Sequence, residues 1–235
     1  LVPFLNEHKD ELQADTCIVC DTSMWDIDTP AITSRLRGMV YIEATLHGPS
    51  HDLHSGGYGG AVVNPANALT EILGQLHDSD GKVQVEGFYD DVVEVSAEQV
   101  AQWNSLGDAD STLLESSGSK AVYGEKGFST LERLWSRPTC DINGLHAGYI
   151  GEGAKTVIGA TATAKISCRL VAHQKPTEIE KSLVSFLESR TPVGCHWEFQ
   201  SFGTAPAIAV PTESPWLSAA SKSLATVFPN PTVLI

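Results

Sequence analysis

The sequence predicts an α+β fold, a two-layer sandwich in which helices cover one face of a largely antiparallel sheet. Two observations lead to this expectation. Strand-like alternation and helix-like apolar spacing follow one another through the central part of the chain, in the order β–α–insert–β–α–β. The 235 residues are 42% apolar and 19% charged, a composition typical of globular proteins with a sizeable core.

The N-terminal part carries one helix pattern and one strand pattern. Residues 3–14 suit a short amphipathic helix, and residues 16–20 form an apolar run typical of a buried strand. Asp21 then falls at the carboxyl end of that strand. The following residues, 22–35, are interpreted as a loop, because Pro30 discourages regular structure.

The clearest strand pattern spans residues 39–47. Apolar and polar residues alternate there, as expected for a strand with one buried face. The bend that follows, residues 48–60, contains five glycines and a candidate functional side chain, His54. Glycines let a backbone approach a ligand closely, and such loops often carry binding or catalytic groups. The alternative is an ordinary surface turn that happens to contain a histidine.

Helix patterns recur after the bend. Asn64 and Pro65 suit the N-cap and first position of a helix with an apolar face. Capping-box patterns begin at Ser96 and Thr177. The predicted helices cover residues 64–76, 96–106, 129–136, 177–187 and 215–227. The segment 107–127 is rich in Gly, Ser and Asp and is predicted to be irregular surface chain.

Further strand patterns cover residues 140–149, 160–170 and 196–202, and a short one starts at 83–85. With 39–47 they complete the predicted antiparallel sheet. Such a sheet has open edges, so an edge strand or a helix face can pair with a second copy of the chain.

The charge balance excludes two classes of partner. The formal net charge is −14, from 29 acidic and 15 basic residues. A chain this acidic repels nucleic acid and anionic membrane surfaces, so neither is an expected partner. No apolar run approaches the roughly 20 residues that a membrane-spanning helix needs.

The cysteines predict a reducing, cytoplasmic environment. There are five of them, an odd number, and they are scattered along the chain rather than spaced as a disulfide framework. Cys17 and Cys20 form a Cys-x-x-Cys pair, but they lie in the apolar run 16–20. Redox pairs usually occupy a helix N-terminus, so these two are interpreted as strand residues.

Several motifs together indicate a family. They are Ile-Val-Cys-Asp-Thr at 18–22, Leu-Arg-Gly at 36–38, Asp-Leu-His-Ser-Gly within 48–60, Gly-Glu-Gly-Ala-Lys-Thr-Val-Ile at 151–158 and Lys-Ile-Ser-Cys-Arg-Leu at 165–170. The sequence resembles the dizinc metallopeptidases related to cytosolic non-specific dipeptidase and carnosinase. That group also includes acetylornithine deacetylase, succinyl-diaminopimelate desuccinylase and aminoacylase. The resemblance runs from about residue 16 to the last residue.

The resemblance implies a domain organisation. Residues 1–36 and 211–235 would be remnants of an α/β catalytic domain, and residues 37–210 would be the lid that also forms the dimer. A His-x-Asp segment, a bridging Asp, a Glu-Glu pair, a Gly-Gly-Ser loop and a final His would lie outside this sequence. The one His-x-Asp present, at His8, is interpreted as a coincidence. We therefore expect an excised piece whose two ends are disordered or packed in a non-native way.

The resemblance also implies roles for four residues. Asp21 would ligate one of two zinc ions, and His54 would reach into the partner's active site to stabilise the oxyanion. Thr156 would contact substrate in the neighbouring subunit, and Arg169 would hold the substrate carboxylate. By residue type alone these are a turn aspartate, a turn histidine, a strand threonine and a solvated or paired strand arginine.

Two further possibilities concern the histidine bend. Asp52, two residues before His54, is a candidate to orient its ring if the backbone is extended. His47, His51 and His54 are a weaker candidate for a metal site of their own, because strand alternation puts the last two on opposite faces and no fourth ligand is nearby.

The implied parent protein is a homodimeric metallodipeptidase or related amidohydrolase that cleaves peptides or acyl-amino acids. Two Zn²⁺ ions per subunit, with Mn²⁺ or Co²⁺ as alternatives, would bridge the attacking hydroxide. This chain, with one ligand of the set, is predicted to hold zinc weakly and to be inactive. The alternative function is a homodimerisation module without chemistry.

Overall fold

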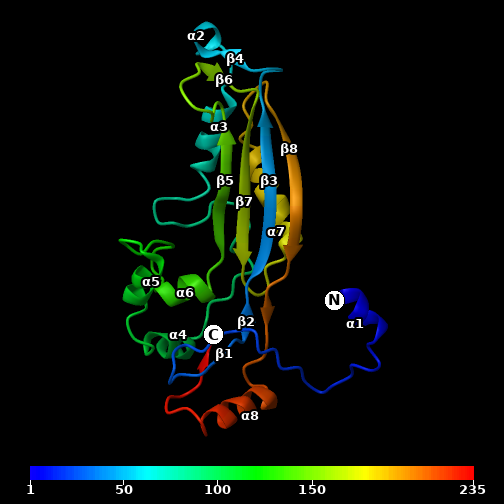
Figure 1. Ribbon diagram of the computed structural model, residues 1–235, viewed down its shortest axis with the longest axis vertical. Helices are drawn as coiled ribbons and strands as arrows, with labels where there is room; N and C mark the ends of the chain where they lie inside the picture. The colour runs from blue at the N-terminus through cyan, green and yellow to red at the C-terminus, as the bar shows by residue number, and fades with distance from the viewer. The chain divides into compact units, whose positions relative to one another are not determined.

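The computed structural model describes all 235 residues and divides into two units. One unit joins residues 1–34 to 210–235, and the other comprises residues 35–209 (Figure 1). Each unit is described by itself below.

The larger unit is built on one four-stranded sheet. Its strands are β3 (Gly38–His47), β5 (Thr139–Ala147), β7 (Thr161–Leu170) and β8 (His196–Ala205). They lie in the order β5-β7-β3-β8, and every neighbouring pair is antiparallel (Figure 1). The predicted fold class is therefore confirmed.

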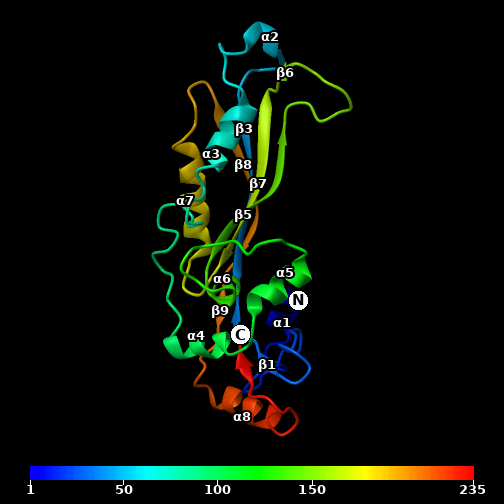
Figure 2. The same cartoon turned by 90° about the vertical axis from the view of Figure 1, so that its left-hand side faces the viewer.

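Two helices, α3 (Pro65–Leu73) and α7 (Pro176–Glu188), cover one face of this sheet (Figure 2). Burying each large aliphatic side chain between the layers stabilises the fold by about 1.5–3 kcal/mol. The core includes Val40, Ile42, Leu69, Ile166, Leu170, Leu183 and Leu187. The alternation in β3 is complete, with every second residue buried, because one face packs on the helices and the other is open.

An insert between α3 and β5 contains three more helices, α4 (Ala97–Asn104), α5 (Ala109–Ser117) and α6 (Thr130–Trp135). The prediction of an irregular segment over 107–127 is wrong for α5, where Asp108 caps the first turn and Gly118 ends the helix in a left-handed conformation. The strand predicted at 83–85 is reduced to a single bridge between His77 and Val83.

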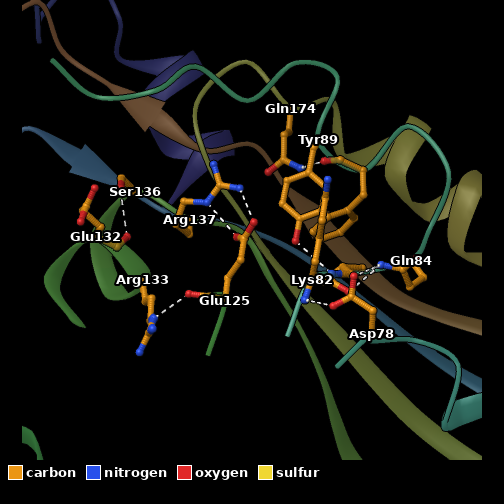
Figure 3. A network of polar contacts seen from close by, with 12 residues as sticks. Asp78, Lys82, Gln84, Tyr89, Glu125, Glu132, Arg133, Ser136, Arg137 and Gln174 are labelled. Carbon is orange, nitrogen blue, oxygen red and sulfur yellow. Dashed lines mark hydrogen bonds and ion pairs between the residues drawn. The ribbon is translucent and has the colours of Figure 1, made fainter. Parts of the chain in front are cut away.

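A polar network fastens the insert to the sandwich (Figure 3). Arg137 forms two hydrogen bonds of 2.8 Å to the Glu125 carboxylate, and both side chains are nearly buried. The Tyr89 hydroxyl accepts a hydrogen bond from the backbone N–H of Val83. Gln174, at the entrance to α7, donates to the carbonyl of Phe88. The Gln174–Phe88 bond joins the insert to a segment 86 positions away, whereas the other bonds hold the insert together internally.

Short elements extend the sheet at its two ends. At one end, where His47 pairs with Thr161, an arm projects that consists of β4 (Leu53–His54), α2 (Ser55–Tyr58) and β6 (Val157–Ile158) (Figure 1). At the other end, β2 (Arg35–Leu36) pairs with β9 (Ile208–Ala209).

The smaller unit has little regular structure. It contains α1 (Val2–Glu7), α8 (Pro215–Leu224) and a parallel pair of β1 (Ala31–Ile32) with β10 (Val233–Leu234). Neither helix buries a residue. The predicted strand at 16–20 is wrong, because no other segment of the chain pairs with it and Ile18 is 80% exposed. No helix in either unit is long and apolar enough to cross a membrane.

Candidate functional site

The arm brings together two predicted site residues, His54 and Thr156, that are 102 positions apart in the sequence. Pairing of β4 with β6 sets His54 opposite Val157, and the N–H of Ser55 donates to the carbonyl of Thr156 at 3.0 Å. The His54 Nε2 atom lies 3.2 Å from the Thr156 hydroxyl. Both side chains are exposed at the tip of the arm.

The other ring nitrogen of His54 is also engaged. The backbone N–H of Gly56 donates to Nδ1 at 2.9 Å. The expectation that Asp52 orients this ring is wrong, because its Oδ1 atom instead accepts a hydrogen bond from the N–H of Ala160 at 2.9 Å. The Ala160 carbonyl accepts in turn from the N–H of Gly48 at 2.9 Å. Asp52 therefore anchors the base of the arm rather than its histidine.

The histidines of this region do not converge on one point. The His47 ring stacks on His196 at 4.8 Å and contacts the Glu198 carboxylate at 3.2 Å. His51 has its own contact, with the Ser50 hydroxyl. No three His, Cys, Asp or Glu side chains anywhere in the chain are grouped so that they hold a metal ion.

A second candidate location is the opposite end of the sheet, where Arg169 lies on the face that the helices leave open. On β7 its neighbours Cys168 and Leu170 are buried, whereas Arg169 is exposed. It pairs with Met39 of β3 and with Thr139 of β5. No ion pair links this guanidinium to a carboxylate.

A second guanidinium, that of Arg37, lies beside the first. Arg37 precedes β3 by one residue, two positions before Met39, the partner of Arg169, and it makes no ion pair either. Partial burial and the positive charge of Arg169 lower the pKa of Arg37, while Asp141 acts in the opposite sense. Asp141 offsets part of this positive charge, but neither guanidinium is in an ion pair, so this end of the sheet favours an anionic ligand.

The two locations are well separated within one chain. Strand β7 runs from Thr161, beside the arm, to Arg169, eight residues later. At roughly 3.4 Å per residue, this stretch of extended chain is about 27 Å long. Figure 1 shows β4 and β6 beyond one end of the sheet and β2 at the other.

Comparison with known proteins identifies the family to which the chain belongs. Residues 36–195 match the model of the M20 peptidase dimerisation domain. The chain belongs to this family. The match lies inside the unit formed by residues 35–209, which contains the sheet, both covering helices and the arm.

Relatives of the dimerisation domain are peptidases. The Cys-Gly metallodipeptidase of Schizosaccharomyces pombe is 31% identical over 169 residues, which cover 72% of this chain and 36% of that protein. The Beta-Ala-His dipeptidase of Homo sapiens is 31% identical over 217 residues, which cover 90% of this chain and 42% of that protein. The chain thus spans less than half the length of these curated relatives.

Solved structures agree with this assignment. An M20 family metallo-carboxypeptidase from Sulfolobus solfataricus superposes with a TM-score of 0.84 at 28% identity, covering 99% of this chain and 52% of that one. Human carnosine dipeptidase 1 gives a TM-score of 0.80 at 27% identity, covering 100% of this chain and 50% of that one.

The fourth predicted site residue, Asp21, belongs to the smaller unit. It is exposed and lies in irregular chain rather than at the end of a strand. No group of three metal-binding side chains includes it. Asp21 is thus a single candidate ligand, whereas a protein zinc site normally uses three or four.

Sequence reasoning missed several residues that shape these locations. Gly56 and Ala160 act through backbone groups, which a sequence motif does not display. The sequence did contain an indication of Arg37, because this residue stands in the Leu-Arg-Gly motif directly before β3. Its charge next to Arg169 follows from the strand register, which becomes visible only when β3 and β7 are paired.

Proposed function

We propose that the parent protein is a metal-dependent dipeptidase that works as a homodimer, and that this chain contributes its lid and dimerisation domain. The observation that carries the proposal is the separation of the two candidate locations. A dipeptide is at most about 7 Å long, whereas Arg169 and the arm of one chain are on the order of 27 Å apart. If His54 and Arg169 act on the same substrate, they must come from different subunits.

In this arrangement His54 extends from one subunit into the site of the other. Its imidazole N–H donates to the oxyanion that develops when the peptide carbonyl is attacked, a contribution of about 3 kcal/mol to transition-state stabilisation. Thr156, hydrogen bonded to the same ring, contacts the substrate from the same arm. The dimerisation domain would join the two subunits, as the placement of His54 in the partner's site requires.

Arg169 holds the carboxylate of a peptide or acyl-amino acid. A guanidinium binds a carboxylate through two parallel hydrogen bonds, which fixes position as well as affinity. Two features support this role. The Arg169 side chain has no carboxylate partner within the chain, and the neighbouring charge of Arg37 adds to the positive potential.

The metal requirement is inferred from the relatives, whose names identify metallodipeptidases. We propose two Zn²⁺ ions per subunit, with Mn²⁺ or Co²⁺ as alternatives and Asp21 as one ligand. Residues 1–36 and 211–235 are proposed to belong to a catalytic domain and 37–210 to be the lid, and the division of the chain into two units near these positions supports this. We also propose a cytoplasmic location, which the odd, scattered cysteines support.

The subunit arrangement can be tested with heterodimers of the full-length protein. One subunit carries His54→Gln and the other Arg169→Met, each with its own affinity tag. In the proposed arrangement one of the two sites keeps both residues, so the purified heterodimer recovers about half of the wild-type activity. Each mutant homodimer is nearly inactive. A heterodimer no more active than its parents would overturn the proposal.

The chain alone is expected to be inactive. One carboxylate does not hold a catalytic zinc ion, so zinc binding measured by calorimetry should be weak and dipeptide hydrolysis absent. Hydrolysis by the purified chain that stops on addition of a chelator would contradict this.

The second candidate function is homodimerisation without catalysis. It is favoured by the confinement of the family match to the dimerisation domain and by the lack of a grouped metal site. The full-length reading frame distinguishes the two functions. A catalytic parent needs a His-x-Asp, a Glu-Glu pair and a late His in frame, and their replacement by other residues would leave the dimerisation module as the better account.

A further inference from the structure

We propose that Gly56 is a positioning residue for His54: its backbone N–H selects the ring tautomer and its missing side chain makes room for the ring. The inference rests on the proposed function, because it concerns the histidine that would stabilise the oxyanion. The tautomer of the His54 ring is also measurable without catalysis.

The directions of two hydrogen bonds determine which ring nitrogen of His54 carries the proton. A neutral imidazole has one N–H donor and one acceptor nitrogen. The Gly56 N–H is a donor only, and it points at Nδ1 of His54 at 2.9 Å, so Nδ1 must be the acceptor. The proton of the neutral ring is then on Nε2, since the hydrogen bond at one nitrogen fixes the state of the other.

This tautomer is the one that the proposed chemistry needs. An oxyanion accepts hydrogen bonds, so the nitrogen facing it must carry a proton. In the structure the Nε2–H group donates to the Thr156 hydroxyl at 3.2 Å. Thr156 therefore satisfies the donor while no substrate is present, and the oxyanion would take its place. With the proton on Nδ1, the Nε2 atom would have nothing to donate.

The space beside Gly56 is occupied by the His54 ring. A Cβ atom built on Gly56 would lie 2.7 Å from Cε1 and 3.0 Å from Nδ1 of His54, closer than van der Waals contact allows. The ring would have to turn or move away, and its bond to the Gly56 N–H would be lost. A Cβ atom built on the next residue, Gly57, has no neighbour within 4 Å. The two adjacent glycines thus form a matched pair for an experiment.

The test compares Gly56→Ala and Gly57→Ala in the full-length protein labelled with ¹⁵N-histidine. At pH about 9, where histidine side chains are neutral, two-bond ¹H–¹⁵N spectra show which ring nitrogen carries the proton. The His54 signals are identified by their absence in His54→Gln. Wild type and Gly57→Ala are expected to show the Nε2–H form, and Gly56→Ala a mixture of the two tautomers. A proton on Nδ1 in wild type, or the pure Nε2–H form in Gly56→Ala, overturns the inference.

Kinetics separates this inference from the proposed function. The donor acts on the transition state, so Gly56→Ala should lower kcat by about 100-fold with little change in KM. Gly57→Ala should stay within about twofold of wild type. If His54→Gln lowers kcat but Gly56→Ala does not, the inference fails and the proposed function stands. If the tautomer is as inferred but His54→Gln keeps full activity, the proposed function fails.

Discussion

The Arg137–Glu125 pair is a buried ion pair, and its loss should lower the stability of the fold. The two side chains are only 10% and 12% exposed, and two hydrogen bonds of 2.8 Å join them. The guanidinium also lies over the rings of Phe128, at 4.1 Å, and Tyr89, at 5.1 Å. Removing one partner would leave the other charge buried and unpaired, which costs more than the pair itself contributes.

Glu125→Gln should therefore lower the free energy of unfolding by about 3–5 kcal/mol, the range typical of a broken buried ion pair. The matched control is the next residue. Lys126 pairs with Asp80 at 3.3 Å, but both side chains are more than half exposed. Lys126→Gln should change stability by at most about 1 kcal/mol. Urea denaturation measures both, and equal effects would contradict the importance assigned to burial.

Tyr89, in the same network, should make the free energy of unfolding depend on pH. Burial raises the pKa of Tyr89 to about 12, from an ordinary value near 10. The unfolded chain then releases this proton at lower pH than the folded chain, so stability should fall as pH rises from 10 toward 12. In Tyr89→Phe this contribution is absent. Unfolding free energies measured from pH 9 to 12 should decline less steeply for the variant, and parallel curves would refute the assignment.

Among the elements, the arm is held at its base by one side chain, that of Asp52. Asp52→Ala removes the acceptor for the Ala160 N–H, a charge-assisted bond. The arm should then open more often, and hydrogen exchange of the Ala160 amide should become about 10–100-fold faster. Asp52→Asn keeps an acceptor oxygen at nearly the same place, so the Ala160 amide of this variant should exchange almost as fast as in the wild type. Equal acceleration in the two variants would show that the side-chain bond does not hold the arm.

Elements with a strong local signal could be predicted from the sequence. The alternation over residues 39–47 gave β3 within one residue, because one face of that strand is buried along its whole length. The helix predicted from Thr177 begins one residue earlier, at Pro176, and Lys175 occupies the N-cap without a side-chain bond. The fixed φ of proline set this start, not the capping box.

Elements that depend on neighbours could not be predicted so well. The apolar run 16–20 has strand composition, yet a strand also needs a bonded neighbour, and composition does not report one. The site shows the same limit. The sequence motifs indicated His54 and Thr156 as candidates, but the bond between them follows from the pairing of β4 with β6. The role of Asp52 was misjudged because Ala160 is 108 residues away in the sequence.

For the whole molecule, the arrangement makes catalysis depend on association. The arm and Arg169 are at opposite ends of ten-residue strands, so an isolated subunit of the proposed enzyme has no complete site. Association follows mass action, and the fraction of complete sites equals the fraction of subunits in dimers. A site built within one subunit would not show this dependence.

Specific activity of the full-length protein should accordingly fall on dilution, in proportion to the dimer fraction measured by sedimentation at the same concentrations. At a concentration where most subunits are monomers, added Arg169→Met subunits should restore activity, because they supply an intact His54 arm to wild-type partners. Added His54→Gln subunits should restore it as well, because their own Arg169 site receives the His54 arm of the wild-type partner, whereas subunits that carry both His54→Gln and Arg169→Met should restore none. A monomer fraction with the specific activity of the dimer would show that the site is complete in one chain and that the arm serves another purpose.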